Sequence, residues 1–226
     1  MKKSTLLLIG LALALVVTPC FATQVTFANF LNPDGSQDVT LLFSNLTNTL
    51  QISPSAPILF QFHNVSVPVA LQGSLAAHLT LSAVTHTVVN ASGQQGGYTG
   101  AFAITLDTPY LGMSNLLSGT FSLAELDGMF NGQYAVFGDS LPPNPVGFTS
   151  DFVDFRSASS ESFALSMTSV NPSLRVNPQH YFDDPAHRFS LSETGSFSAD
   201  FVPEPISLLL LGSGLIGLGL LRRRRK

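Results

Sequence analysis

The strongest constraint on the fold is a period-two alternation of apolar and polar residues in the body of the chain. From Leu75 to Val89 the odd positions are mostly apolar, while the even positions carry histidine, threonine and serine. Because successive side chains of a β-strand point to opposite faces, this pattern predicts a strand with one buried and one polar face. Similar patterns predict further strands near Val25–Phe27, Val39–Phe43, Ile58–Phe62, Phe102–Leu106, Phe121–Leu123, Phe148–Phe155, Phe163–Met167, Phe189–Leu191 and Phe197–Phe201.

Turn-forming residues separate these runs. Gly96-Gly97 predicts a turn, and Glu193-Thr194-Gly195 predicts a three-residue hairpin loop between the last two strands. Ala124–Phe130 could form one helical turn at most, and no helical period is sustained elsewhere in the body. Nine to eleven short strands joined by turns predict an all-β fold, an antiparallel β-sandwich, with jelly-roll and Ig-like topologies both open. We expect this domain to span residues 23–201.

The body of the chain is acidic. Residues 23–201 contain 13 Asp and Glu against 3 Arg, a net charge of −10, because the other seven of the ten cations lie near the two ends. A surface of this sign repels phosphate backbones, so we expect no nucleic acid partner. The chain also has no tryptophan, which removes the most common aromatic platform for a sugar ring.

The first 22 residues are typical of a secretory signal peptide. Two lysines precede the apolar run Leu6–Val17, and small residues follow it, which predicts cleavage by signal peptidase between Ala22 and Thr23. The mature chain would then lack cysteine, and with it disulfides and thiol chemistry. Alternatively, Cys20 is the acylated first residue of a lipoprotein, although Pro19 is a poor residue directly before such a cysteine.

The last 25 residues, 202–226, divide into three parts. Proline restricts the residue before it to extended conformations, so the first part is expected to be extended. The second, Ile206–Leu221, has sixteen uncharged residues and predicts a single transmembrane helix of about 24 Å, short for a bilayer core of about 30 Å. The third is a basic cluster that would stop transfer and stay cytoplasmic. The first part is Val202, Pro203, Glu204 and Pro205, and the third is Arg222, Arg223, Arg224, Arg225 and Lys226.

These three parts, in this order at the C-terminus, resemble a PEP-CTERM sorting domain, and Pro203-Glu204-Pro205 matches that family's motif. The resemblance implies a bacterial protein exported across the inner membrane and processed by an exosortase, a membrane-embedded transpeptidase-like enzyme. It also implies an association with biofilm and exopolysaccharide. The protein would be single-pass in the membrane before processing and then reach the surface or the medium. The alternative is a plain membrane anchor preceded by a chance Pro-Glu-Pro.

Candidate ligand and catalytic residues are few. His78 and His86 would share one face of a strand about 27 Å apart, too far to share a metal. The segment His180–His187 combines two histidines with two aspartates, and Asp151 with Asp154 could contribute to a calcium site. In each case a solvated surface is the more common explanation. No nucleophile elbow, phosphate-binding loop or zinc signature occurs.

We therefore expect a non-enzymatic envelope or extracellular-matrix protein, structural or adhesive, with no catalytic residue, no metal and no cofactor. Its expected partners are signal peptidase, the exosortase, the membrane at least transiently, and exopolysaccharide. A carbohydrate-binding module on the same fold is the alternative. A glycoside hydrolase using a carboxylate pair is a third and weaker one.

Overall fold

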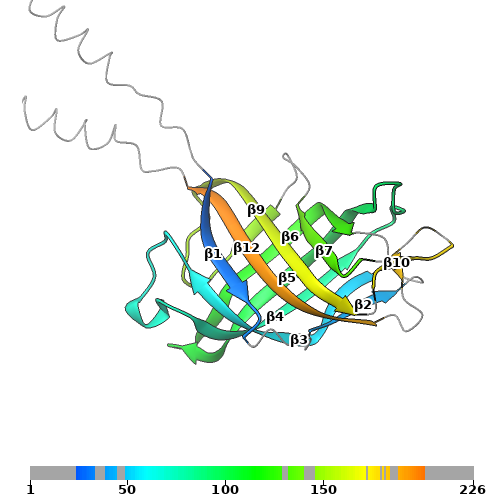
Figure 1. The fold of residues 1–226 in the computed structure, drawn as a ribbon. Coiled ribbons are helices and arrows are strands. Elements are labelled where there is room, and N and C mark those ends of the chain that lie inside the picture. Colours follow the sequence, from blue (N-terminus) through cyan, green and yellow to red (C-terminus); the bar gives the residue numbers. More distant parts are fainter. Residues whose placement is uncertain are drawn as a thin grey trace, which may run out of the picture. The chain divides into compact units, whose positions relative to one another are not determined.

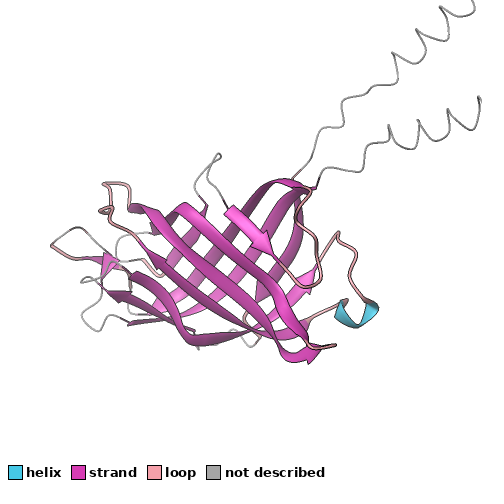
Figure 2. Ribbon diagram, turned by 180° about the vertical axis from the view of Figure 1, so that it is seen from behind, coloured by secondary structure: helices cyan, strands magenta, loops and turns pink. Residues whose placement is uncertain are grey.

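The computed structural model describes residues 24–33, 39–44, 49–128, 132–139, 146–171, 173–178, 180, 182–183 and 188–201. A compact unit spans Gln24–Asp200 and is built from strands and one short 3-10 helix, η1 (Val69–Leu71) (Figures 1 and 2). The strands are β1 (Val25–Leu31), β2 (Val39–Ser44), β3 (Thr49–Phe62), β4 (Leu75–Val84), β5 (Gln94–Tyr110), β6 (Met113–Gly128), β7 (Tyr134–Asp139), β8 (Val146–Thr149), β9 (Ala158–Asn171), β10 (Arg175–Val176), β11 (Phe182–Asp183) and β12 (Arg188–Phe201).

The main sheet closes on itself because its first and last strands pair. β1 pairs with β12 and β3, and β12 also pairs with β9. The neighbours therefore run β12, β1, β3, β4, β5, β6, β7, β9 and back to β12, in the order of the chain. The result is an eight-stranded antiparallel barrel of up-and-down topology (Figure 1). Eight strands enclose a space that side chains alone can fill.

Two of the eight positions in the barrel wall are each occupied by two short strands in succession. β1 and β2 both lie between β12 and β3, and β7 and β8 both pair with β6. The residues between the paired strands, 32–38 and 140–145, contain four of the chain's prolines. Proline has no N–H to donate to a neighbouring strand, so the sequence of both stretches disfavours one continuous strand.

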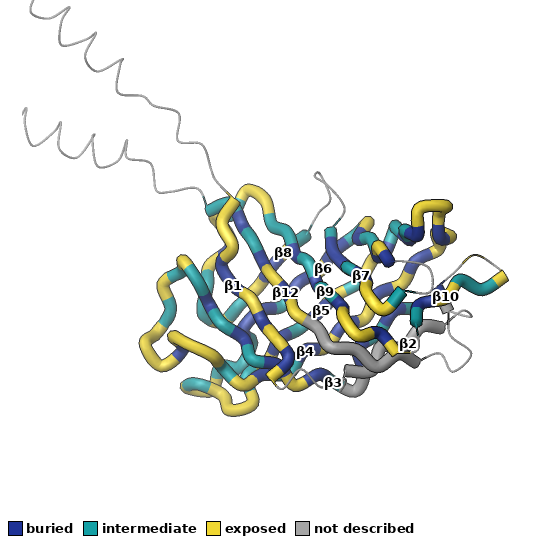
Figure 3. Tube along the Cα trace, in the orientation of Figure 1, coloured by how far each residue is buried: buried dark blue, intermediate teal, exposed yellow. Residues whose placement is uncertain are grey.

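Phenylalanine rings fill the interior of the barrel. Buried and exposed residues alternate along the strands, with the buried set facing inward (Figure 3). The Phe102 ring centre lies 5.3 Å from that of Phe197 and 5.5 Å from that of Phe163. Phe197, itself fully buried, also contacts Phe60 at 6.4 Å. Such offset and tilted ring pairs add to the free energy gained by burying their apolar area.

Two glycines make room for these rings. A Cβ atom at Gly195 would lie 2.1 Å from Cε1 of Phe30, and one at Gly119 would lie 2.3 Å from Cε1 of Phe102. Both glycines are on strands whose partners carry the affected ring, since Gly195 pairs with Phe30 and Gly119 with Phe102. Glycine is therefore needed at these two strand positions because any larger side chain would clash with the neighbouring phenylalanine ring.

The predicted β-sandwich is wrong. In a sandwich two sheets keep free edges and pack face to face, whereas here the β9–β12 and β12–β1 pairings leave one continuous wall. Inward and outward residues alternate in both architectures, so the sequence pattern could not separate them. The transmembrane helix that formed part of the same prediction is also not supported. Among the described residues no helix has the length and apolar character to cross a membrane, and segment 206–221 lies outside them.

Several local predictions need correction. β12 runs through Glu193-Thr194-Gly195 without reversing, so the predicted hairpin is wrong. Gly96 and Gly97 lie inside β5, where the register with β6 shifts between Gln95 and Tyr98, and they do not form a turn between strands. Residues 124–128 belong to strand β6 and not to a helical turn. The strand predicted near Phe148–Phe155 ends at Thr149.

The two ends of the barrel carry different connections. At one end β1 begins and β12 finishes, with Val25 opposite Ala199; we call it the chain-end rim. The opposite end is called the far rim. The chain-end rim holds segment 63–74 between β3 and β4, the turn Leu111-Gly112 between β5 and β6, and segment 150–157 between β8 and β9. The far rim holds segment 85–93 between β4 and β5 and the β10–β11 ribbon.

Candidate functional site

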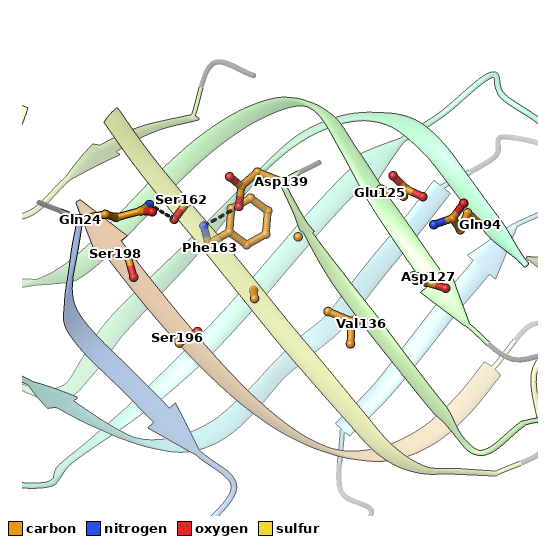
Figure 4. A pocket seen from close by; sticks show the side chains of 12 residues that line it. Gln24, Gln94, Glu125, Asp127, Val136, Asp139, Ser162, Phe163, Ser196 and Ser198 are labelled. Carbon is orange, nitrogen blue, oxygen red and sulfur yellow. Dashed lines mark hydrogen bonds between the residues drawn. The ribbon is translucent and has the colours of Figure 1, made fainter. Parts of the chain in front are cut away.

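A groove of about 520 Å³ crosses the outer wall of the barrel, over β6, β7, β9 and β12 (Figure 4). Gln24, Ser162, Ser198 and Asp139 lie toward one end of it, and Gln94, Glu125 and Asp127 lie toward the other (Figure 4). Its lining residues are Gln24, Gln94, Glu125, Asp127, Val136, Gly138, Asp139, Ser162, Phe163, Ala164, Ser196 and Ser198.

Serine side chains of β9 and β12 form the hydroxyl end of the groove. Ser162 accepts a hydrogen bond of 2.5 Å from the Gln24 amide (Figure 4). The Ser198 hydroxyl lies 3.2 Å from the Thr26 hydroxyl. These serines occupy outward positions because the adjacent residues, Phe163 and Phe197, point into the core. The strand alternation that builds the core therefore also places this row of hydroxyls outside.

Carboxylates of β6 lie at the other end of the groove, beside the Gln94 amide of β5. Glu125 and Asp127 are two residues apart on β6 and therefore share its outer face. Val136 and Gly138 of β7 lie between them and β9. Gly138 also lets β7 approach β9 closely, because a Cβ atom there would lie 2.6 Å from the Phe163 carbonyl oxygen.

Two half-buried carboxylates lie where β7 gives way to β8. The β7–β9 ladder ends at Gly138, and Asp139 then accepts the N–H of Phe163 through its carboxylate at 2.8 Å. Glu161 of β9 accepts the N–H of Phe148 in the same manner. Burial raises the pKa of both carboxyl groups, and the backbone hydrogen bonds offset part of that effect. Where the β7–β9 ladder ends, carboxylate side chains therefore accept the N–H groups that backbone carbonyls accept within the ladder.

The groove offers hydrogen-bond donors and acceptors, and it also has apolar surface, to which Val136 and Ala164 contribute. Serine hydroxyls, glutamine amides and carboxylates can pair with the hydroxyl groups of a saccharide or with a polar peptide. The one aromatic residue in its lining, Phe163, is buried in the core and offers no exposed ring face. Among the described residues, no three His, Cys, Asp or Glu side chains are grouped closely enough to hold a metal ion.

The two aspartates considered for calcium have separate structural contacts. Asp151 accepts the N–H groups of Ser114 and Asn115 at 3.0 and 2.9 Å, which fixes segment 150–157 to the start of β6. Asp154 forms an exposed ion pair with Arg156, 2.5 Å between Oδ2 and the guanidinium nitrogen. That hydrogen-bonded arginine lowers the pKa of Asp154 to about 2. The structure does not bring these carboxylates to one site.

The histidines are also separated. His78 lies on the outer face of β4, and its Nδ1 is 2.6 Å from a carboxylate oxygen of Asp107. His86 lies beyond the end of β4 at Val84, so the prediction that both share one strand face is wrong. His180 is exposed, and its carbonyl oxygen accepts the N–H of Val89. His187 lies outside the described residues, which leaves the His180–His187 segment only partly described.

The fold places this chain in the class of up-and-down antiparallel barrels with a packed interior. Residues 201–225 match the family model of the PEP-CTERM protein-sorting motif. The chain therefore carries that motif, as Pro203-Glu204-Pro205 predicted, and the motif supports an exported cell-envelope protein sorted by an exosortase. The match covers 25 of the 226 residues. No curated protein and no solved structure matches the chain significantly.

Sequence reasoning did not find the groove or the carboxylates beside it. Asp139 and Glu161 are 22 positions apart, and only the antiparallel pairing of β7 with β9 brings their surroundings together. The serines gave a partial signal, since Ser196 and Ser198 alternate with apolar residues along the last strand. Sorting residues 202–226 and the predicted signal peptide, including Ala22 and Thr23, lie outside the described residues.

Proposed function

We propose that the barrel is a non-catalytic structural or adhesive module of the cell envelope and its extracellular matrix, delivered there through the PEP-CTERM motif. The observation that carries this proposal is the packed interior. Phenylalanine side chains occupy the space in which a barrel of this size would otherwise hold a small ligand. Contacts with partners therefore fall on the outer wall and on the two rims.

The composition of the outer wall supports a role in a hydrated matrix. Serine and threonine side chains occupy many of the outward positions of β9 and β12 and some of those of β4 and β5, and charged groups are sparse. Such a surface stays wetted without depending on salt, because hydroxyl hydrogen bonds are not screened as ion pairs are. It also presents many groups that can exchange hydrogen bonds with water for hydrogen bonds with polysaccharide.

The first test is the mass of the C-terminal peptide from envelope and medium fractions of the native host. We expect a C-terminus near Pro203–Pro205 with the apolar run removed. A variant with alanine at Pro203, Glu204 and Pro205 should retain a peptide that contains Leu221. The structural role predicts that the processed protein sediments with the exopolysaccharide fraction and is released when that polymer is digested. Full-length protein that stays in the cytoplasm would contradict the proposal.

Carbohydrate binding at the outer groove is a second candidate, favoured by the hydroxyl and carboxylate groups that line it. Co-sedimentation with the host's own exopolysaccharide tests this function. Replacing exposed Ser196 by phenylalanine would block the groove, and the same change at exposed Ser82, outside the groove on β4, is the matched control. Equal binding by the two variants would rule the groove out as the binding site.

A further inference from the structure

A second hollow, also of about 520 Å³, lies on the connection between β8 and β9 at the chain-end rim. One unbroken run of the chain, residues 148–156, lines it. It shares no lining residue with the outer groove. The side chains of this run therefore form a separate candidate site, which we call the rim hollow.

Aromatic residues form the inner side of the rim hollow. Phe148 and Phe155 line it, are only 5% and 8% exposed, and lie 5.6 Å apart between ring centres. Phe152 also lines it but is only half-buried, so part of its surface stays in contact with solvent. The ring of Tyr110, at the end of β5, lies 6.4 Å from that of Phe152. The rim hollow therefore offers a partly exposed aromatic ring, which the outer groove lacks.

Hydrogen bonds hold the rim hollow in shape. Asp151 donates its N–H to the Asn115 carbonyl oxygen at 3.0 Å, and its carboxylate Oδ2 accepts the N–H groups of Ser114 and Asn115. The N–H of Phe152 donates to Ser150 Oγ at 3.0 Å. These bonds fix the lining to the start of β6 before any ligand arrives. A site that is already ordered loses less conformational entropy on binding.

The polar side chains of the lining keep groups available for a ligand. Asp151 uses only Oδ2 for its two backbone bonds, and its Oδ1 makes no hydrogen bond to any described residue. Asp154 accepts from Nε and Nη2 of Arg156, which holds the guanidinium in place. The remaining nitrogen, Nη1, has no partner within the described part of the chain, and the Arg156 side chain is 90% exposed. The rim hollow thus presents a free acceptor beside free, fixed donors.

These groups match a neutral sugar ring better than a charged one. An anionic sugar would meet Asp151 and Asp154, a cationic sugar would meet Arg156, and contacts between like charges are unfavourable. Sugar hydroxyl groups both donate and accept, so they can pair with the free carboxylate oxygen and with the free guanidinium N–H groups. The C–H face of the same ring is apolar and can pack on the accessible part of Phe152.

We propose that the rim hollow binds one neutral pyranose unit of a polysaccharide. Phe152 packs against the sugar ring, and Asp151 and Arg156 hydrogen-bond its hydroxyl groups. This assignment deepens the proposed matrix role and rests on it, because exopolysaccharide is the saccharide that the barrel meets in a matrix. Binding at one end of the barrel leaves the long outer wall free for other contacts.

A tryptophan reporter tests the site, because the chain has no tryptophan of its own. Phe152→Trp would be made in the protein that the native host produces and titrated with neutral gluco-, manno- and galacto-oligosaccharides. We expect at least one of them to change the intensity and position of the emission. The matched control is Val88→Trp, a 48% exposed position on the far rim, whose emission should not respond.

Calorimetry with the responding oligosaccharide measures the contribution of each side chain in protein without a reporter. Phe152→Ala should weaken binding about tenfold, because the apolar contact with the sugar ring is lost. Arg156→Gln should weaken it about threefold to fivefold, because hydrogen-bond donors are lost. Ser196→Phe, which blocks the outer groove, should leave the affinity unchanged.

Three results would overturn the site. They are Phe152→Trp emission that no neutral oligosaccharide changes, a response to uronate or amino-sugar oligomers alone, and equal affinity of Phe152→Ala and the unmodified protein. Failure of the matrix role is measured separately, by sedimentation of the unmodified protein with the native exopolysaccharide. If that sedimentation fails while the titration succeeds, the matrix role is wrong and the saccharide site in the rim hollow stands.

Discussion

The two rims of the barrel are closed by different kinds of interaction. At the chain-end rim Phe155 folds over the opening and lies 5.0 Å from Phe27 and 5.6 Å from Phe148 between ring centres. At the far rim the buried Tyr98 hydroxyl donates to Gln95 Oε1 at 2.8 Å, and the Gln95 amide donates to the Thr87 carbonyl oxygen at 3.0 Å. One rim therefore depends on ring volume and the other on satisfied polar groups.

This difference predicts how mutations at each rim lower the free energy of unfolding. Removing a ring leaves a cavity, and its cost scales with the volume lost. Removing one partner of a buried hydrogen bond leaves a polar atom without water, and its cost is the desolvation of that atom. Burial raises the pKa of Tyr98 far above its ordinary value, so its hydroxyl keeps its proton and remains a donor at any ordinary pH.

The largest effect is expected from Phe148→Ala at the chain-end rim. Phe148 is buried and contacts the rings of Phe27, Phe102, Phe155 and Phe197. Truncation should lower the free energy of unfolding by about 3–5 kcal/mol, because nearby backbone cannot collapse into the cavity. Urea denaturation measures the loss, and hydrogen exchange should show it first at the chain-end rim.

Phe152→Ala is the matched control for that variant. Phe152 is in the adjoining segment, is only half-buried and has Tyr110 as its ring neighbour, at 6.4 Å. It should therefore cost clearly less than Phe148→Ala. Equal losses would mean that Phe148 and Phe155 do not close this end of the barrel.

A smaller effect is expected from Tyr98→Phe at the far rim. The change keeps the ring against Phe137 and removes only the hydroxyl that donates to Gln95. Leaving that amide oxygen buried without its donor should cost about 1–3 kcal/mol. Because Gln95 retains its bond to Thr87, combining the change with Gln95→Leu in a double-mutant cycle isolates the coupling. Additive losses in the cycle would show that the two groups do not act together.

The smallest effect on stability is expected from Asp139→Asn, which changes the half-buried carboxylate that accepts a backbone N–H of β9. The pKa of Asp139 is raised above 3.8 by burial, so the folded protein binds this proton more tightly than the unfolded chain does. Stability from this group therefore falls as the pH rises from its ordinary pKa through its raised folded pKa. Asp139→Asn keeps an acceptor for the Phe163 N–H and removes the charge.

We accordingly expect Asp139→Asn to stabilise the barrel at pH 7 by less than about 1 kcal/mol, since the group is only half buried and solvent screens it. The gain should vanish below the ordinary pKa of aspartate. Denaturation across pH 3–7 measures the difference, with Asp154→Asn as a control on the exposed ion pair. Loss of stability at pH 7 in Asp139→Asn would mean that the charged hydrogen bond outweighs the cost of burial.

Local features of the strands were readable from the residues. The alternation in Leu75–Val84 and Phe197–Phe201 located β4 and the end of β12, because a half-buried strand requires that period. The same reasoning failed at Glu193-Thr194-Gly195, where glycine makes room for Phe30 instead of forming a turn. A glycine that accommodates a ring on a neighbouring strand looks identical, within its own segment, to a glycine in a turn.

The site could be anticipated only in part. Hydroxyls at alternate positions of the last strand were visible, but the groove also needs carboxylates from β6 and β7. Asp151 and Asp154 are close in sequence but do not share a site. Asp151 accepts a backbone N–H, whereas Asp154 forms an ion pair with Arg156. Spacing along a chain therefore says little about shared sites in a wall made of long antiparallel strands.

By itself the sequence determined the strand-rich class, the acidic body and the sorting motif at the C-terminus, because each follows from local period, charge count or a contiguous motif. Only the tertiary structure decided that the sheet closes. Closure depends on β12 pairing with β9 and also with β1, whose residues lie more than 160 positions from their partners, and no local pattern encodes that contact. The same closure brought the start of β1 and the end of β12 side by side at one rim of the barrel.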